Sequence, residues 1–98
     1  MKEDSKKTFV IEGSRVKSMD EFYDEVHRVL CPRFKGFGRS WNAFRDILRG
    51  GFLEFELDEP INIIIADSKK MSKHLPESQY NHFIKYLEEA SNVSYELR

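Results

Sequence analysis

Cysteine is almost absent from this sequence, and the single Cys31 cannot form a disulfide within the chain. Cys31 precedes Pro32 and has no second cysteine at a C-x-x-C spacing. This context favours a small buried or half-buried thiol over the alternative, a reactive nucleophile. The 98 residues fit one domain that can bury a useful core without disulfides, and the cysteine usage fits a reducing compartment.

Long hydrophobic runs are also missing. The longest, Ile61 to Ala66, is interrupted by Asn62 and is far shorter than the roughly 20 apolar residues that span a bilayer. The first residues are polar and charged with no apolar run behind them, unlike a signal peptide. We therefore predict a flexible leader over residues 1–7, a single domain over residues 8–98, and a soluble cytoplasmic protein with no membrane partner.

Neither sign of charge dominates, and catalytic motifs are missing. The formal net charge of −1 favours no class of partner. No Gly-x-Ser-x-Gly or Walker pattern is present, and the three histidines lack the spacing of a zinc site. We therefore predict no metal, no cofactor and no enzymatic activity.

What the sequence does contain is a regular alternation of strand and helix signals. The dense β-branched run at 61–66 predicts a buried strand, and shorter runs predict strands at 8–11 and 93–97. Apolar residues at helical spacing, placed between capping residues and glycine or proline, predict four helices. These helices are predicted to begin near Ser18 or Asp20, after Ser40, at Asp67 or Ser68, and at Pro76-Glu77, and the first three to end near Pro32, Gly50-Gly51 and Leu75.

The resulting order is β-α-α-β-α-α-β. Strands separated by helix pairs cannot form hairpins, so we predict an α/β fold in which a three-stranded parallel sheet with right-handed crossovers packs against about four helices. On the second helix, four polar residues lie at i, i+3, i+4 and i+7 and share one face. They are Asn42, Arg45, Asp46 and Arg49. Asp46 is expected to point outward, either to bind a partner or to pair with Arg49, a contact worth roughly 0.2–0.5 kcal/mol.

The segment from Phe37 to Gly50, FGRSWNAFRDILRG, resembles the signature of the barstar family. That family has an aromatic-Gly pair followed by a helix with aspartate, alanine and leucine positions and a final glycine, and its order of elements matches residues 8–97. The resemblance implies a barstar-like fold and an inhibitor of a ribonuclease, for self-protection or for immunity to a ribonuclease toxin. It also implies a cytoplasmic protein whose partner is that ribonuclease, and we expect a monomer when free.

The resemblance also implies where the partner binds. Asp46 matches the central aspartate of the family's helix and is expected to occupy the position of a substrate phosphate. The family often has an acid on the last helix, for which Glu89 is the best match, although a shifted register places Lys85 there instead. The predicted partner-binding residues are Phe34, Lys35, Phe37, Gly38, Arg39, Asn42, Arg45, Asp46, Arg49 and Glu89.

The chain departs from the family pattern at two positions. Asn42 replaces an aspartate, and Arg45 stands where the family's namesake has an aromatic residue. Between Arg33 and Arg49, five basic residues accompany a single acid, which gives this segment a net charge of +4. Either the partner differs from barnase and has an acidic rim of its own, or other acids dominate the contact.

This basic-aromatic segment, residues 33–49, leaves a second function open. Aromatic side chains stack on bases and cations contact phosphates, so a small nucleic-acid-binding domain is the alternative. Two observations weaken it. Trp41 and Phe44 fit the core face of their helix, and the remainder of the chain is net negative.

Overall fold

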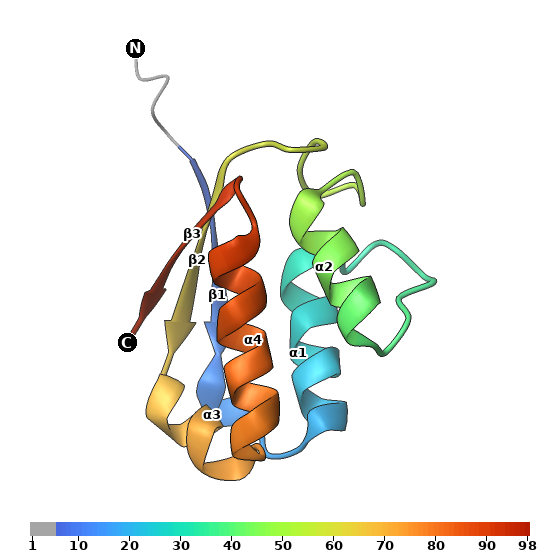
Figure 1. The fold of residues 1–98 in the computed structure, drawn as a ribbon. Coiled ribbons are helices and arrows are strands. Elements are labelled where there is room, and N and C mark those ends of the chain that lie inside the picture. The colour runs from blue at the N-terminus through green and yellow to red at the C-terminus, as the bar shows by residue number, and fades with distance from the viewer. Residues whose placement is uncertain (1–5) are drawn as a thin grey trace.

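The computed structural model describes residues 6–98. Within this range the chain follows the predicted order β-α-α-β-α-α-β, with one short 3-10 helix after the first strand (Figure 1). The elements are β1 (Lys7–Glu12), η1 (Gly13–Arg15), α1 (Met19–Leu30), α2 (Trp41–Arg49), β2 (Ile61–Ala66), α3 (Ser68–His74), α4 (Glu77–Glu89) and β3 (Val93–Leu97). Residues 1–5 of the predicted leader lie outside the described part of the chain, and β1 already begins at Lys7.

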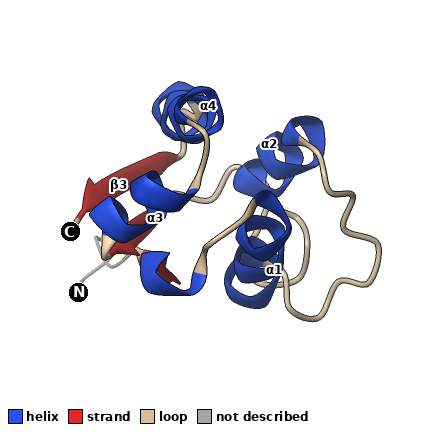
Figure 2. Ribbon diagram, turned by 90° about the horizontal axis from the view of Figure 1, so that it is seen from below, coloured by secondary structure: helices blue, strands red, loops and turns tan. Residues whose placement is uncertain are grey.

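The three strands form one parallel sheet in the order β1-β2-β3. Ile61 of β2 is paired with Lys7 on one side and with Val93 on the other. Each crossover advances by one strand in the same direction, so right-handed connections bring both helix pairs to the same face. Figure 2 shows α1, α2 and α4 on that side of the sheet.

The central strand is buried on the face that the helices cover. Ile61, Ile63 and Ile65 are completely buried, whereas Asn62 and Ile64 are half-buried. The prediction of a buried strand is therefore correct for one face of β2 and wrong for the other. The reason is topological, because no helix of residues 6–98 packs against the second face.

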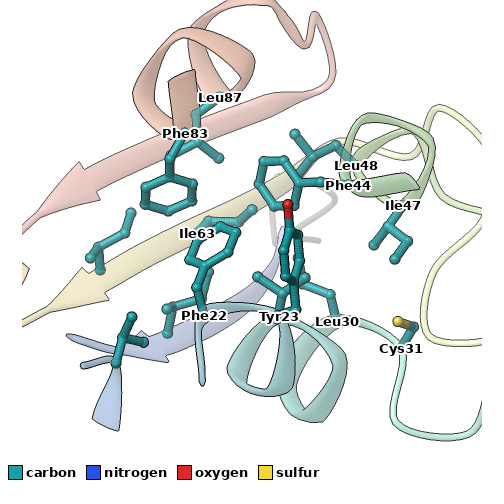
Figure 3. Close-up of a cluster of buried hydrophobic side chains, with 14 of the residues drawn as sticks. Phe22, Tyr23, Leu30, Cys31, Phe44, Ile47, Leu48, Ile63, Phe83 and Leu87 are labelled. Carbon is teal, nitrogen blue, oxygen red and sulfur yellow. The ribbon is translucent and has the colours of Figure 1, made fainter. Parts of the chain in front are cut away.

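The hydrophobic core lies between β2 and helices α1, α2 and α4 (Figure 3). Phe22 of α1 is fully buried there, with ring centroids 5.7 Å from Phe44 of α2 and 5.0 Å from Phe83 of α4. Cys31 borders this core and is also fully buried, which confirms the predicted buried thiol. These contacts fix α2 in relation to the other two helices.

Two of the predicted N-caps are confirmed. The hydroxyl of Ser18 accepts a hydrogen bond from the Glu21 amide, and that of Ser40 accepts one from the Ala43 amide, both at 3.1 Å. At α3 the prediction of a side-chain cap is wrong. Asp67 occupies the N-cap position in the left-handed region, with φ of 51°, and its side chain makes no capping bond. An effective N-cap needs extended backbone instead.

The helix α2 ends at Gly50, as predicted. Gly50 has φ of 94°, and a Cβ atom placed on it would overlap the carbonyl group of Glu56. Glycine is therefore required here both for its backbone conformation and for the close return of the 50–60 loop. This abrupt end leaves the last turn of α2 exposed on its outer side.

Candidate functional site

The outer face of α2 is the centre of the candidate site. Its four predicted polar residues are all exposed, while Phe44, Ile47 and Leu48 on the opposite face are buried. This confirms the prediction that these four residues share the outward face of α2. Asp46 forms no ion pair with any described residue, so the alternative of a pair with Arg49 is not observed. Arg49 instead lies 3.9 Å from a carboxylate oxygen of Asp58.

Contacts near both ends hold α2 against α4 and the chain that follows it. At the first residue, the indole N–H of Trp41 donates to Oε1 of Gln79 over 2.8 Å, and the indole stacks on Tyr86 at 5.6 Å. Near the last turn, the side-chain amide of Asn92 donates to the Leu48 carbonyl over 2.9 Å. Trp41 is half-buried, so it forms the edge of the core rather than its interior.

The loop before α2 is anchored to α1. Nε2 of His27 lies 2.7 Å from the Phe34 carbonyl oxygen, and the His27 ring stacks on Phe37 at 5.9 Å. Arg39 donates to the carboxylate of Asp24 over 2.8 Å and to the carbonyl oxygen of Asp20 over 2.6 Å. The loop therefore has a defined position next to the outer face of α2.

Asp46 lies at the junction of this loop and the helix. It borders a shallow hollow of about 160 Å³ that the rings of Phe34, Phe37 and Phe52 also line, together with Gly38. Among these residues, Phe34 and Phe52 meet edge to face with ring centroids 4.9 Å apart. The structure thus brings together the loop aromatics, Gly38 and Asp46 on one surface.

A second groove lies on the other side of α2. It has a volume of about 300 Å³, and its lining includes Arg45 and Arg49 from α2, Tyr86 and Glu89 from α4, and Asn92. Of the two candidates on the last helix, Glu89 shares this groove with α2. Lys85 lines a different hollow, with Ser78, Asn81 and His82.

Part of the basic charge in the segment 33–49 is compensated within the chain. Arg33 pairs with Glu54 at 2.7 Å, and Arg39 pairs with Asp24. Arg39 also lies 5.7 Å from the centre of the Tyr23 ring. The arginines of this segment that line the groove are Arg45 and Arg49, fewer cations than the sequence alone suggested.

One buried carboxylate, Glu25, lies outside the site and was not predicted from the sequence. Glu25 of α1 is only 3% exposed and accepts from the Glu12 amide at 2.8 Å and from Arg28 at 2.6 Å, with Arg15 at 3.3 Å. Burial alone would raise the pKa of Glu25, but these hydrogen bonds and cations lower it overall. Arg28 lies three positions after Glu25 on α1, so helical spacing accounts for that pair, but the partners at positions 12 and 15 precede α1 and are not predicted by it.

The structure is a small α/β domain with a parallel sheet, and its helix α2 has an aromatic hollow on one side and a charged groove on the other. The family model described as Barstar (barnase inhibitor) matches residues 6–96, and the chain therefore belongs to the barstar family. Membership implies the role of a barnase-type ribonuclease inhibitor, and proteins of this family are inhibitors rather than enzymes. None of the curated proteins compared with the chain matches it.

No group of three or more histidine, cysteine or carboxylate side chains in residues 6–98 is arranged to hold a metal ion. No helix in the same range is long and apolar enough to cross a membrane.

Proposed function

We propose that this protein inhibits a ribonuclease by placing the outer face of α2 and the loop at 33–39 in the nuclease active site. Asp46 takes the position of a substrate phosphate, and Phe34 and Phe37 supply apolar contact beside it. The observation that carries this proposal is the placement of Asp46, an exposed carboxylate without an ion-pair partner in residues 6–98, at the edge of an aromatic hollow.

The physical basis is charge complementarity on a rigid support. A ribonuclease active site presents cationic groups to phosphate, and a carboxylate can occupy that position with charge-assisted hydrogen bonds. The bonds of Trp41 to Gln79 and of Asn92 to Leu48 support a rigid α2, so little conformational freedom is lost on binding. The long side chains of Arg45 and Arg49 select among nucleases by repelling those with a cation opposite them.

The proposal includes the biological setting. The inhibitor acts in the cytoplasm as a monomer when free, and it protects the cell either from its own ribonuclease or from a ribonuclease toxin. The direct nucleic-acid alternative has weaker support, because the Trp41 ring is stacked on Tyr86 of α4. In addition, Arg33 and Arg39 are paired with acids of the same chain.

Co-expression with a ribonuclease tests the proposal. A candidate ribonuclease, sought in the reading frames next to that of this chain, and barnase in parallel, are expressed with the wild type, with Asp46→Asn, or with Glu77→Gln. Glu77 is a matched control because it is an exposed carboxylate in the first turn of α4. We expect the wild type and Glu77→Gln to protect the cells and Asp46→Asn to fail. Equal protection by all three would remove Asp46 as the anchor.

A binding measurement separates the alternative function. The nucleic-acid alternative predicts that the isolated protein retains single-stranded RNA at low salt and releases it after Arg45→Ala. We expect no retention by either protein. Retention that depends on Arg45, without protection in cells, would favour the alternative.

A further inference from the structure

The groove between α2 and α4 contains charges of both signs that are not used inside the molecule. Arg45 and Arg49 lie on the α2 side and Glu89 on the α4 side. Neither Arg45 nor Glu89 forms an ion pair with any described residue, and Arg49 has only the 3.9 Å contact to Asp58. All three side chains are exposed. Their charges are therefore available to a partner.

The size and stiffness of the groove fit side chains of a protein. A volume of about 300 Å³ equals that of about ten water molecules at about 30 Å³ each, which leaves room for two side chains. At its base, the amide of Asn92 donates both to the Leu48 carbonyl at 2.9 Å and to the Glu59 carbonyl at 3.1 Å. The opposite side includes Tyr86, which is stacked on Trp41. The groove is thus built on fixed groups and does not have to be formed on binding.

We infer that this groove receives a pair of opposite charges from the partner ribonuclease, an acidic side chain against Arg45 and Arg49 and a basic side chain against Glu89. The inference rests on the proposed function and specifies the partner chemistry at the edge of the same site. Arg45 and Asp46 are neighbours on a helix and diverge by about 100° around its axis. When Asp46 enters the cationic centre of the nuclease, Arg45 must face the rim of that cleft.

Charge complementarity favours a pair of opposite charges from a protein over nucleic acid as the occupant of the groove. A phosphate backbone brings negative charge alone, and Glu89 and Asp58 in the same lining would repel it. A uniformly cationic nuclease surface would be repelled by Arg45 and Arg49. A rim with one acid and one base satisfies both sides of the groove, and this selects a nuclease by the arrangement of its charges as well as by its catalytic centre.

Charge reversal tests the inference. The probe is an inactive variant of the ribonuclease against which this chain protects cells, and its dissociation constant is measured by calorimetry at two salt concentrations. We expect Arg45→Glu and Glu89→Lys each to weaken binding by tenfold or more. The matched control is Lys85→Glu, an exposed charge on α4 outside the groove, which should change affinity less than threefold. Circular dichroism confirms folding, and Arg45→Gln, which removes charge without reversing it, should give an intermediate loss.

Compensating substitutions identify the partner groups. Each acid on the rim of the nuclease cleft is replaced by lysine and combined with Arg45→Glu, and one combination should recover at least tenfold of the lost affinity. Binding that is unchanged or tighter after Arg45→Glu, or no recovering combination, would overturn the inference while leaving the proposed function in place. A wild type that inhibits no ribonuclease would overturn both. Retention of a single-stranded RNA oligomer that is lost after Arg45→Glu would assign the groove to phosphate and also overturn the inference.

Discussion

The side-chain amide of Asn92, in the turn before β3, donates a hydrogen bond of 2.9 Å to the backbone carbonyl of Leu48 near the end of α2. The same amide donates to the carbonyl of Glu59 at 3.1 Å. One side chain thus joins the end of the candidate binding helix, the 50–60 loop and the start of the third strand. Asn92 also lines the groove beside Arg45 and Arg49, so this link supports the last turn of α2 at the base of that groove.

Loss of this link should lower stability and loosen α2. Asn92→Ala leaves two part-buried carbonyl oxygens without their donor, and we expect the free energy of unfolding to fall by about 1–3 kcal/mol. Urea denaturation measures this change, and amide hydrogen exchange should be faster in the last turn of α2. Asn81→Ala, at an exposed position of α4, is the control and should change stability by less than about 0.5 kcal/mol. Equal effects of the two substitutions would contradict this role of Asn92.

Glu25 should make the stability of the protein depend on acid pH. Its pKa is lowered in the folded state relative to the ordinary value of 4.5, because hydrogen bonds from Arg28 and the Glu12 amide outweigh the effect of burial. A group with a lowered folded-state pKa contributes stability that is fully present above its unfolded value and is lost as the pH falls through the folded value. The contribution of Glu25 is therefore expected at neutral pH and should disappear progressively below about pH 4.5.

The variant Glu25→Gln tests this linkage. At pH 7 it loses charge-assisted hydrogen bonds to a buried group, and we expect a destabilisation of about 2–3 kcal/mol. The difference from the wild type should shrink as the pH is lowered below 4.5, which unfolding curves at several pH values will measure. Glu77→Gln, an exposed control, should show no comparable pH dependence. A difference that stays constant with pH would contradict the linkage.

The sequence predicted the elements of this protein well, because capping residues and apolar spacing are local signals. The bounds of β2 and β3 and the caps at Ser18 and Ser40 follow from a few neighbouring residues. The outer face of α2 could be predicted equally well, since positions three and four apart on a helix share a side. The spacing of residues along one helix or strand does not reveal which residues of another element lie next to it.

The contacts that the sequence did not predict join residues of different elements. Asn92 reaches Leu48 across 44 positions, and Arg39 is directed to Asp24 by the path of a loop. Glu89 and Lys85 share one face of α4, so which of them lies beside Arg45 depends on the position of α4 along its axis relative to α2. Glu25 was missed for the same reason, because its burial depends on β1 and η1.

Cys31 should be almost unreactive in the folded protein. Its thiol is completely buried, and burial together with the nearby carboxylate of Glu54 raises its pKa to about 11. At pH 8 the thiolate fraction is then very small, and a reagent such as a disulfide of nitrobenzoate cannot reach the sulfur. We expect labelling to proceed at the rate of transient opening and to become rapid in denaturant. Rapid labelling under native conditions would show that the loop after α1 opens freely.

Alanine substitutions at two glycines, Gly50 and Gly38, should distinguish an effect on stability from an effect on partner binding. At Gly50 the backbone has φ of 94°, and a methyl group would overlap the Glu56 carbonyl and the Phe55 ring. We expect Gly50→Ala to destabilise the protein by about 1–3 kcal/mol or more, measured by thermal denaturation. At Gly38 a Cβ atom would make only an ordinary contact of 3.5 Å with Cβ of Ala43.

Gly38→Ala should therefore keep the stability of the wild type within about 0.5 kcal/mol. Gly38 nevertheless lines the hollow beside Asp46, where the proposed complex brings the nuclease close to the backbone. An added methyl group there should weaken inhibition at least tenfold while the melting temperature stays the same. Gly51→Ala is not a suitable control, because its φ of 85° adds strain of its own. If Gly38→Ala inhibits the ribonuclease as well as the wild type does, the partner does not approach this loop closely, and the proposed contact surface must shift toward the groove between α2 and α4.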